Sequence, residues 1–302
     1  MVHLDKPAKD TGVFSTEEVQ PPDGSTQSIS RIIAFPRNHY ATAPNVAAGF
    51  KALHLSRAGP LRANLFGSDI TKDSFVVTVE TWGESVLYSA EGTWIEHKAN
   101  AKDCHFGQFD TAELFPDARE TPQQVERRIS FPPDVRKRWK GRDPPHVVCW
   151  LNRIDLSNEF GRNFRMSAHA TQATGAGFTA HLDTWGNTSM SGAAMCWIAF
   201  PRSKRGVATG SFSTSDVRLW SKPRAQTSGT VRFADLNGGK GFAKAPTVLA
   251  ALNGFDMRGN TDLRVKVHVD EVSKEGFRWH LDTWGDTTLY SASASWIALG
   301  FE

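Results

Sequence analysis

Hydrophobic and polar residues alternate with a period of two along most of this 302-residue chain. The stretches 76–82, 178–185 and 263–272 alternate or run apolar over five to eight residues and are rich in Val, Thr, Phe and Trp. This pattern is typical of short strands with one buried face. No window of helical length carries an apolar stripe at i, i+3 and i+4 spacing. The pattern therefore predicts an all-β protein.

The strand pattern occurs three times, with the same landmarks in the same order. Each copy contains a Thr-Trp-Gly triplet and a second tryptophan twelve residues after the first. The period of about 100 residues is too long for a solenoid repeat and fits a small domain. The repeat predicts three tandem six-stranded antiparallel β-sandwiches. Their boundaries are expected at residues 1–103, 104–206 and 207–302.

The two tryptophans of each copy differ in their surroundings. The second lies beside Ile and Ala in a strand of small residues, which predicts a core position for Trp94, Trp197 and Trp296. The first stands next to Gly and then Glu, Asn or Asp, so the segment is expected to form a hairpin tip. An indole at such a tip packs poorly in a core and can instead be a platform for the apolar face of a ligand. Local chemistry leaves both roles open for Trp82, Trp185 and Trp284.

Two further residue types recur at fixed spacing. An arginine stands thirteen residues before a phenylalanine in every copy, and a tyrosine follows the first tryptophan by six residues in copies 1 and 3. Together with the Thr-Trp turn and the closing Ser-Trp-Ile, this order resembles the H-type lectins, the family of snail agglutinins and of the C-terminal module of discoidins. The resemblance covers almost the whole chain, three times over.

The resemblance implies six-stranded antiparallel β-sandwiches that associate in threes. It also implies binding of terminal galactose or N-acetylgalactosamine at the cleft between neighbouring domains. A guanidinium group can hold sugar hydroxyls in fixed geometry, and an indole can cover the apolar face of a sugar ring. Because one sugar makes few contacts, multivalent binding is expected. The residues that match the family's binding residues are Arg62, Trp82, Tyr88, Arg165, Trp185, Arg264, Trp284 and Tyr290.

Several positions depart from the family pattern. The snail agglutinin has a sugar-contacting histidine after the turn tryptophan, where this chain has Gly83, Gly186 and Gly285. Copy 2 has Ser191 at the tyrosine position. It also has two extra residues between Asp155 and Arg165, compared with His54 to Arg62 and Asp256 to Arg264. The family's loop aspartate has only Asp23 and Asp117 as candidates. The three copies are therefore expected to differ in ligand, or one to be silent.

The segments that join successive copies are short, roughly residues 98–107 and 202–210. At about 3.3–3.6 Å per residue they span at most about 30 Å, the width of one small sandwich. We expect an intramolecular pseudo-threefold trimer in which the arginine of one copy faces the tryptophan and tyrosine of the next. The single chain would supply its own trimer, and a higher oligomer stays open.

Charge and composition argue against several functions. The chain has 35 Lys and Arg against 32 Asp and Glu, a formal net charge of +3, which is not the strongly basic surface of a nucleic-acid-binding protein. The basic run 136–142 occurs in copy 2 alone and is interpreted as a solvated loop rather than an anion site. No cofactor is implied.

Export and membrane signals are also missing from the sequence. No segment resembles a signal peptide or approaches the ~20 apolar residues that span a bilayer, so no membrane insertion is expected. The three cysteines show neither CxxC spacing nor repeat-matched positions, which predicts reduced, structural thiols and no disulfide framework. These features predict a cytoplasmic or non-classically secreted protein.

An enzyme is a second hypothesis. His181 and Asp183 share a strand face, as do His280 and Asp282, so each pair could share a proton. Copy 1 has Thr78 and Glu80 there, and no nucleophile or second acid recurs as a glycosidase would need. The copies share no HxH or CxxC set for a metal. These side chains are interpreted as a solvent-facing strand, so no catalytic residue and no metal site are expected.

The sequence thus predicts a multivalent, metal-independent lectin for galactose- or N-acetylgalactosamine-type glycans, with cell adhesion as an expected role. The alternative is a structural or protein-interaction module of three sandwiches with silent sugar sites. That alternative accounts for the packed hydrophobic core expected in each sandwich. It does not explain why the arginine and the turn tryptophan persist in copies that have diverged widely elsewhere.

Overall fold

The structure, a computed structural model, describes residues 12–18, 26–99, 101, 103–116, 121–141, 143–235 and 241–300. Asp23, Asp117 and Arg142 lie outside the described residues, as does the start of the chain. Within the described part, no helix is long and apolar enough to cross a membrane. Nearly all regular structure there is β, which confirms the predicted class.

Each copy contributes six strands to the fold. Copy 1 contains β1 (Val13–Ser15), β2 (Ser28–Ala34), β3 (Asn45–Leu55), β4 (Leu61–Ser68), β5 (Ser74–Glu80) and β6 (Leu87–His97). Copy 2 contains β7 (His105–Asp110), β8 (Gln124–Ser130), β9 (His146–Leu156), β10 (Phe164–Thr174), β11 (Gly177–Asp183) and β12 (Met190–Phe200). Copy 3 contains β13 (Val207–Ser213), β14 (Ser228–Arg232), β15 (Thr247–Met257), β16 (Leu263–Asp270), β17 (Gly276–Asp282) and β18 (Leu289–Leu299).

Helical structure in the described residues is limited to short segments. The α-helix is α1 (Pro133–Trp139), and the 3-10 helices are Thr16–Glu18, Thr111–Glu113, Glu159–Gly161, Thr214–Asp216 and Phe233–Asp235. Helix α1 corrects the interpretation of the basic run as a solvated loop. Its Trp139 is 3% exposed and packs edge to face on Phe131, with ring centroids 5.0 Å apart. A helix of seven residues is too short to show a hydrophobic period, so it could not be predicted from the residue pattern.

Within a copy, two three-stranded half-sheets pack face to face. In copy 1 they are β1-β6-β3 and β2-β5-β4, and the other copies repeat this order. The second tryptophan of each copy lies between the half-sheets, with its ring edge to face on a phenylalanine of the fifth strand. The ring centroids are 5.6, 5.2 and 5.1 Å apart in the pairs Phe75–Trp94, Phe178–Trp197 and Phe277–Trp296. Exposures of 2%, 8% and 1% confirm these three tryptophans as core residues.

The six-stranded sheets extend across the boundaries between copies. Their strand orders are β2-β5-β4-β9-β12-β7, β13-β18-β15-β10-β11-β8 and β1-β6-β3-β16-β17-β14. Each sheet therefore joins one half-sheet from each of two copies, and every copy pairs with both others. We call the three junctions seam 1/2 (β4 with β9), seam 2/3 (β10 with β15) and seam 3/1 (β16 with β3). Each has four residue pairs in the same relative register.

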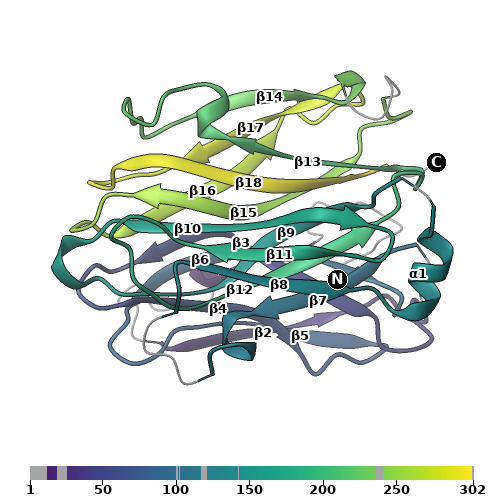
Figure 1. The fold of residues 1–302 in the computed structure, drawn as a ribbon, viewed down its shortest axis with the longest axis horizontal. Coiled ribbons are helices and arrows are strands. Elements are labelled where there is room, and N and C mark those ends of the chain that lie inside the picture. Colours follow the sequence, from purple (N-terminus) through teal and green to yellow (C-terminus); the bar gives the residue numbers. More distant parts are fainter. Residues whose placement is uncertain are drawn as a thin grey trace.

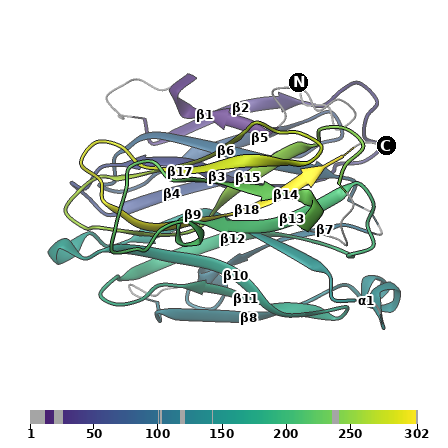
Figure 2. The same cartoon turned by 90° about the horizontal axis from the view of Figure 1, so that it is seen from above.

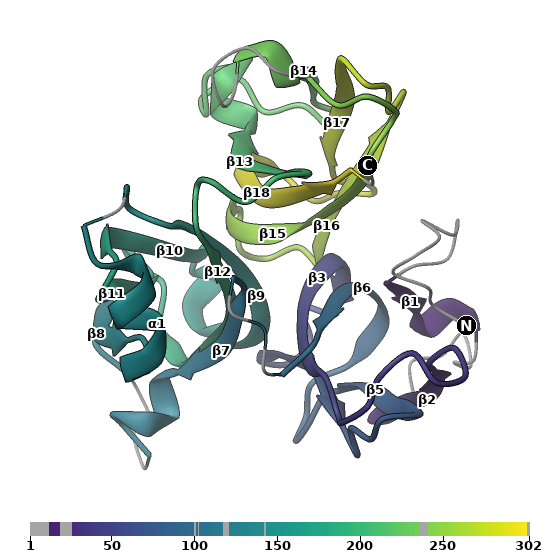
Figure 3. The same ribbon diagram turned by 90° about the vertical axis from the view of Figure 1, so that its right-hand side faces the viewer.

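The three copies surround a common axis, with β3, β9 and β15 nearest the centre (Figure 3). The strands of all copies run along the long direction of the molecule (Figures 1 and 2). The fifth residues of β3, β9 and β15 are Gly49, Trp150 and Ala251. Trp150 is completely buried, and its indole N–H donates to the Ser295 carbonyl of copy 3 at 3.0 Å. A Cβ added to Gly49 would lie 2.4 Å from the Trp150 Cβ and 2.8 Å from the Ala251 Cβ. One large residue, Trp150, and two small residues, Gly49 and Ala251, therefore fill the centre.

A second buried cluster surrounds this centre, with residues from all three copies: Ala47, Ile95, Cys104, Val148, Trp150, Cys196, Ile198, Phe200, Leu249, Ala251 and Ile297. It contains two of the three cysteines, and all three are buried free thiols as predicted. In this cluster burial raises the pKa of the Cys104 thiol to about 12 and that of Cys196 to about 11, so both stay protonated.

We expect this central packing to be measurable in solution as a coupling between copies 1 and 2. Trp150→Ala should lower the free energy of unfolding by about 3–5 kcal/mol because it leaves a cavity. Gly49→Leu should lower it by about 1–3 kcal/mol through overpacking. In the double variant the leucine fills the cavity, so the effects should deviate from additivity by about 0.5–3 kcal/mol. Small-angle scattering should give a radius of gyration near 19 Å, as for one compact domain of this length.

Simple additivity of the two substitutions, together with an elongated three-bead scattering profile, would show that the copies do not pack together in solution. Ile32→Ala is the control, because Ile32 is 72% exposed on β2. Its effect on stability should be within about 0.5 kcal/mol, as for most surface substitutions.

Candidate functional site

The Thr-Trp-Gly segment forms a tight turn in every copy, but it does not close a hairpin. The preceding strand and the following strand lie in different half-sheets, so the turn carries the chain from one sheet to the other. This corrects the expected hairpin tip. The tight turn itself is confirmed: the N–H of Ser85 donates to the Trp82 carbonyl at 3.3 Å, and copies 2 and 3 have the same bond. Local turn chemistry cannot distinguish the two arrangements.

The turn is tied to the strand that carries the predicted arginine. In copy 1 the Thr81 hydroxyl donates to the Arg62 carbonyl at 2.7 Å, and in copy 3 the Thr283 hydroxyl donates to the Arg264 carbonyl at 2.6 Å. The register of the fourth and fifth strands, continued by two residues, places each arginine opposite the turn tryptophan. The arginine and the tryptophan of one site therefore belong to the same copy. The prediction that they face each other from different copies was wrong.

The glycine after each turn tryptophan has a structural reason. Gly83, Gly186 and Gly285 have φ values of +62°, +65° and +63°, which L side chains rarely adopt. A Cβ at these positions would lie 2.7, 2.7 and 2.9 Å from the Nη1 atom of the arginine in the same copy. The guanidinium group thus occupies the space that a side chain after the tryptophan would need. This explains the departure from the histidine of the family pattern.

Across each seam, the arginine pairs in register with one polar residue of the next copy. The Arg62 Nε donates to Asp155 Oδ1 at 3.1 Å, and the Arg165 Nε lies 3.3 Å from Asp256 Oδ1. At seam 3/1 the Arg264 Nε donates to the His54 Nε2 at 3.0 Å. Sequence reasoning used these three partners only as spacing markers. Their matched positions in the three copies are a signal from which the sequence could have identified them.

The tyrosine position of each site lies on the neighbouring copy, as predicted. Each cross-seam partner also pairs with a residue of the last strand in its own copy: His54 with Ser89 and Asp256 with Ser291. These residues are adjacent to Tyr88 and Tyr290. Tyr88 of copy 1 therefore lies at seam 3/1 and Tyr290 of copy 3 at seam 2/3. At seam 1/2, Asp155 pairs with Gly192, next to Ser191.

Seam 3/1 is an aromatic site. The His54 ring lies between Tyr88 and Trp284, with centroid distances of 4.7 and 5.8 Å. Arg264 Nη1 donates to Asp286 at 2.5 Å and Nη2 donates to Asp262 at 2.6 Å, which fixes the guanidinium. Burial and, secondly, the Arg264 charge lower the pKa of His54. His54 is thus neutral, with Nε2 free to accept the arginine hydrogen bond.

Seam 2/3 contains an aromatic residue that the sequence did not reveal. Trp220 is 65% exposed and packs edge to face near Tyr290, with centroids 6.3 Å apart. The buried Arg218 holds this loop against the last strand, because its Nη1 donates to the Tyr290 carbonyl at 2.8 Å. Trp220 lies outside the repeated motifs, so an alignment of the three copies does not identify it. On the other side of the seam, Trp185 is 39% exposed, and the Arg165 Nη1 donates to Asn187 at 2.7 Å.

Seam 1/2 has a second arginine beside its turn tryptophan. Arg153 of copy 2 stands over the Trp82 ring of copy 1, 5.7 Å from its centroid, in a cation–π contact. The Arg153 Nη1 lies 2.8 Å from both carboxylate oxygens of Asp110. The arginine also lies beside Gly192, next to the serine at the tyrosine position. An arginine thus covers the tryptophan where the other seams have a tyrosine.

The H-type lectin domain family matches residues 30–95, 142–200 and 239–299, which together make up more than half of the chain. The chain belongs to the H-type lectin family. Membership of this lectin family supports a carbohydrate-binding role, and each match contains the arginine and turn tryptophan of one copy. The lectin is also similar to the protein named ATP synthase subunits region ORF 7 of Fuscovulum blasticum, with 32% identity over 59 residues. These residues are 20% of this chain and 51% of that protein, so the chain spans about half of its length.

The glycine after the turn tryptophan gives a test of the arginine's position. Gly186→Ala should cost about 1–2 kcal/mol of stability, because a non-glycine residue is strained at this φ. It should also displace the Arg165 guanidinium and weaken ligand binding at seam 2/3. The control is Gly141→Ala in the same copy: Gly141 has φ +69° and no atom within 4 Å of an added Cβ.

Denaturant unfolding and a binding titration of both variants check this expectation. The stability losses should be similar, and only Gly186→Ala should weaken binding. Equal binding by the two variants would contradict the assignment of Arg165 to the site.

Proposed function

We propose that this H-type lectin binds galactose- or N-acetylgalactosamine-type glycans in clefts at its three seams, without catalysis and without needing a metal for sugar recognition. One observation carries the proposal. At every seam a fixed arginine and a turn tryptophan of one copy meet a polar residue of the next, and this polar residue pairs with the arginine. A protein that used its sandwiches only as spacers would not need this arrangement three times.

The chemistry of the seams suits a sugar with one apolar face. Trp185 and Trp284 are 39% and 37% exposed, so part of each indole is free to cover the C–H groups of a galactose ring. Asp286 is 64% exposed while bound to Arg264, and such a carboxylate can accept hydrogen bonds from sugar hydroxyls. Preorganised polar groups beside an apolar platform are the usual composition of a small-ligand site.

The three seams should differ in the glycans they accept. Seam 3/1 combines His54, Tyr88 and Trp284, whereas seam 2/3 adds Trp220 beside Tyr290. Seam 1/2 places Arg153, which is paired with Asp110, over its tryptophan, so a ligand there meets a polar cover on the indole. Because the sites are joined in one chain, a ligand surface that presents several sugars gains from effective concentration.

A glycan array followed by titration calorimetry tests the proposal. We expect binding to galactose-type glycans in the presence of a chelator. Trp284→Ala and Arg264→Ala should each abolish binding at seam 3/1, and the exposed Ile32→Ala should bind as the unaltered chain does. Absence of binding to any glycan by folded protein would leave the alternative, a structural or protein-interaction module.

Seam 3/1 should be sensitive to acid. The pKa of His54 is lowered from its ordinary value of 6.5. The neutral form, which accepts the arginine hydrogen bond, is therefore fully populated above pH 6.5 and is lost as the pH falls through the lowered pKa. Protonation would place a second cation against Arg264. With Trp82 and Trp185 replaced by alanine to leave one site, affinity should be constant above about pH 6.5 and should fall as the pH is lowered from there to about 5. In the same background His54→Asp, which reproduces the other seams, should abolish most of this fall. An equal fall in both proteins would contradict the role of His54.

A further inference from the structure

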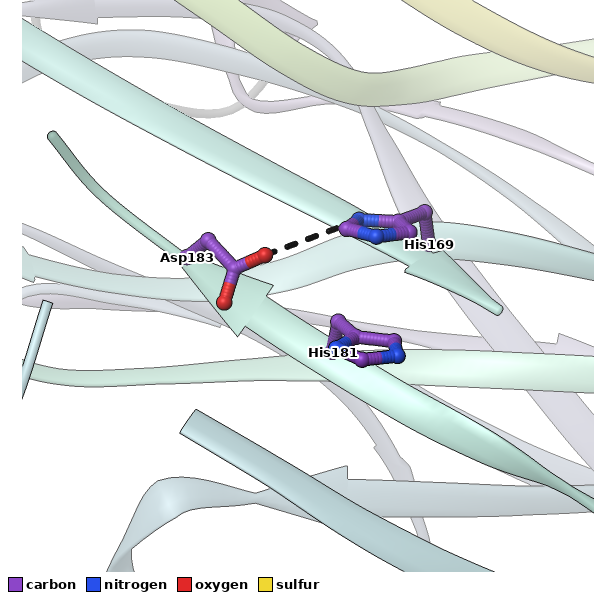
Figure 4. A group of neighbouring side chains, drawn as sticks. All are labelled: His169, His181 and Asp183. Atoms are coloured by element: carbon purple, nitrogen blue, oxygen red, sulfur yellow. Dashed lines mark ion pairs between the residues drawn. The ribbon is translucent and has the colours of Figure 1, made fainter. Parts of the chain in front are cut away.

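Two groups of histidine and aspartate side chains occupy equivalent places in copies 2 and 3, apart from the residues assigned to sugar binding. They are His169, His181 and Asp183 in copy 2 and His268, His280 and Asp282 in copy 3. In each group the candidate ligand atoms all lie within 4.8 Å of one another. Figure 4 shows the copy 2 group, in which the aspartate points toward the two imidazoles.

The sheet register brings each group together. His169 pairs directly with His181, and His268 pairs directly with His280, on antiparallel neighbouring strands. Side chains at such positions have Cβ atoms about 4.5–5.5 Å apart. The aspartate follows the second histidine by two residues and therefore lies on the same face. The rings stack with centroids 4.6 and 4.2 Å apart, nearly parallel in both groups.

Hydrogen bonds within the protein satisfy only some atoms of these groups. The Thr171 hydroxyl lies 2.7 Å from His181 Nε2, and the Thr227 N–H donates to Asp282 Oδ1 at 3.1 Å. Asp183 Oδ1 and His268 Nδ1 are buried atoms without a hydrogen-bond partner among the described residues. Leaving buried polar atoms unpaired costs stability, so such atoms call for an explanation. Within each group the aspartate lies at ion-pair distance from the first histidine, 3.8 Å from His169 Nδ1 to Asp183 Oδ2 and 3.9 Å from His268 Nδ1 to Asp282 Oδ2.

A second carboxylate lies near each group, from a different position in each copy. In copy 2 it is Glu126 on β8, 3.7 Å from His181 Nδ1. In copy 3 it is Asp270 on β16, 3.2 Å from His280 Nε2. Each group therefore offers two imidazoles and two carboxylates. Imidazole together with carboxylate suits Zn²⁺, Cu²⁺ and Ni²⁺, whereas Ca²⁺ and Mg²⁺ prefer oxygen ligands alone.

We propose that each of the two groups binds one Zn²⁺ ion through its two histidines and its aspartate. The histidine side chains at the surface can rotate, since those of His169 and His268 are 43% and 37% exposed. The stacked rings must turn in this way for a nitrogen of each to reach the ~2.0–2.2 Å bond lengths of zinc. Copy 1 has no such site, because it carries Phe66, Thr78 and Glu80 at the matching positions.

The sequence predicted no metal site because the copies share no HxH or CxxC motif, and both motifs have their ligands close together in the sequence. The ligands here come from two adjacent strands and follow the spacing His, eleven residues, His, one residue, Asp in copies 2 and 3. Neither histidine alone distinguishes the site, and only the register of the sheet brings the second histidine opposite the first. The sites do not depend on the proposed sugar specificity, and zinc alone is the probe.

Titration calorimetry of the metal-free full chain with Zn²⁺ tests the proposal. We expect two zinc ions per chain, one in His169→Gln or His268→Gln, and none in the double variant at the same affinity. Asp183→Asn should lower the zinc affinity of one of the two sites by at least about tenfold. Even the loss of a residue that only hydrogen-bonds to a metal ligand lowers metal affinity by about 10–100-fold. The matched control is Thr78→Ala, which alters the equivalent position of copy 1 and should leave both sites intact.

Nuclear magnetic resonance of the histidine ring nitrogens identifies the ligands independently of the variants. Zinc should shift the ring signals of His169, His181, His268 and His280. Two outcomes would overturn the proposal: a zinc stoichiometry unchanged in the double variant, or zinc-dependent shifts at other histidines such as His97 or His146 with none at these four. A failure to bind zinc would also overturn it and would leave the proposed lectin function untouched.

Discussion

The geometry of this lectin depends on one indole at the centre of the molecule. Trp150 occupies the space that Gly49 and Ala251 leave open at the same position of the other two copies. Protein interiors are close-packed, so three tryptophans would collide there and three glycines would leave a void. A chain with three different copies can meet this constraint with one large and two small residues. Three identical subunits would have to meet it with one residue type.

The central packing fixes which strand edges meet, and those edges carry the binding chemistry. Each seam has the same four-residue register, so the arginine always faces the same position of its neighbour. That position is aspartate at two seams and histidine at the third. The scaffold thus keeps the backbone geometry constant while single substitutions, such as Ser191 and Arg153, change what a seam presents to a ligand. The tandem arrangement allows this divergence because each seam is encoded separately.

The sequence predicted much of the architecture, because alternation and repetition are local signals. Strand content, the three copies, the core tryptophans and the tight turn were all visible there. The partners of strand edges were not, since alternation shows which face of a strand is buried and says nothing about which edge is paired. For this reason the Arg62–Asp155 contact, the copy that supplies each tryptophan and the facing histidine pairs required the structure. Trp139 and Trp220 were missed because they lie in segments that do not repeat.

Each copy pairs with both of the others, and this ring of contacts affects how the chain folds during synthesis. Seam 1/2 can form once the second copy has been synthesised, but the β3 edge of copy 1 stays unpaired until β16 of copy 3 emerges. An exposed strand edge is a template for pairing with any available strand. Copy 3 of one nascent chain could therefore pair with copy 1 of another on the same polysome, which would give open chains of molecules in place of closed rings. The first copy thus waits for its second partner until copy 3 has been synthesised, and crowded synthesis exposes the protein to misassembly during that interval.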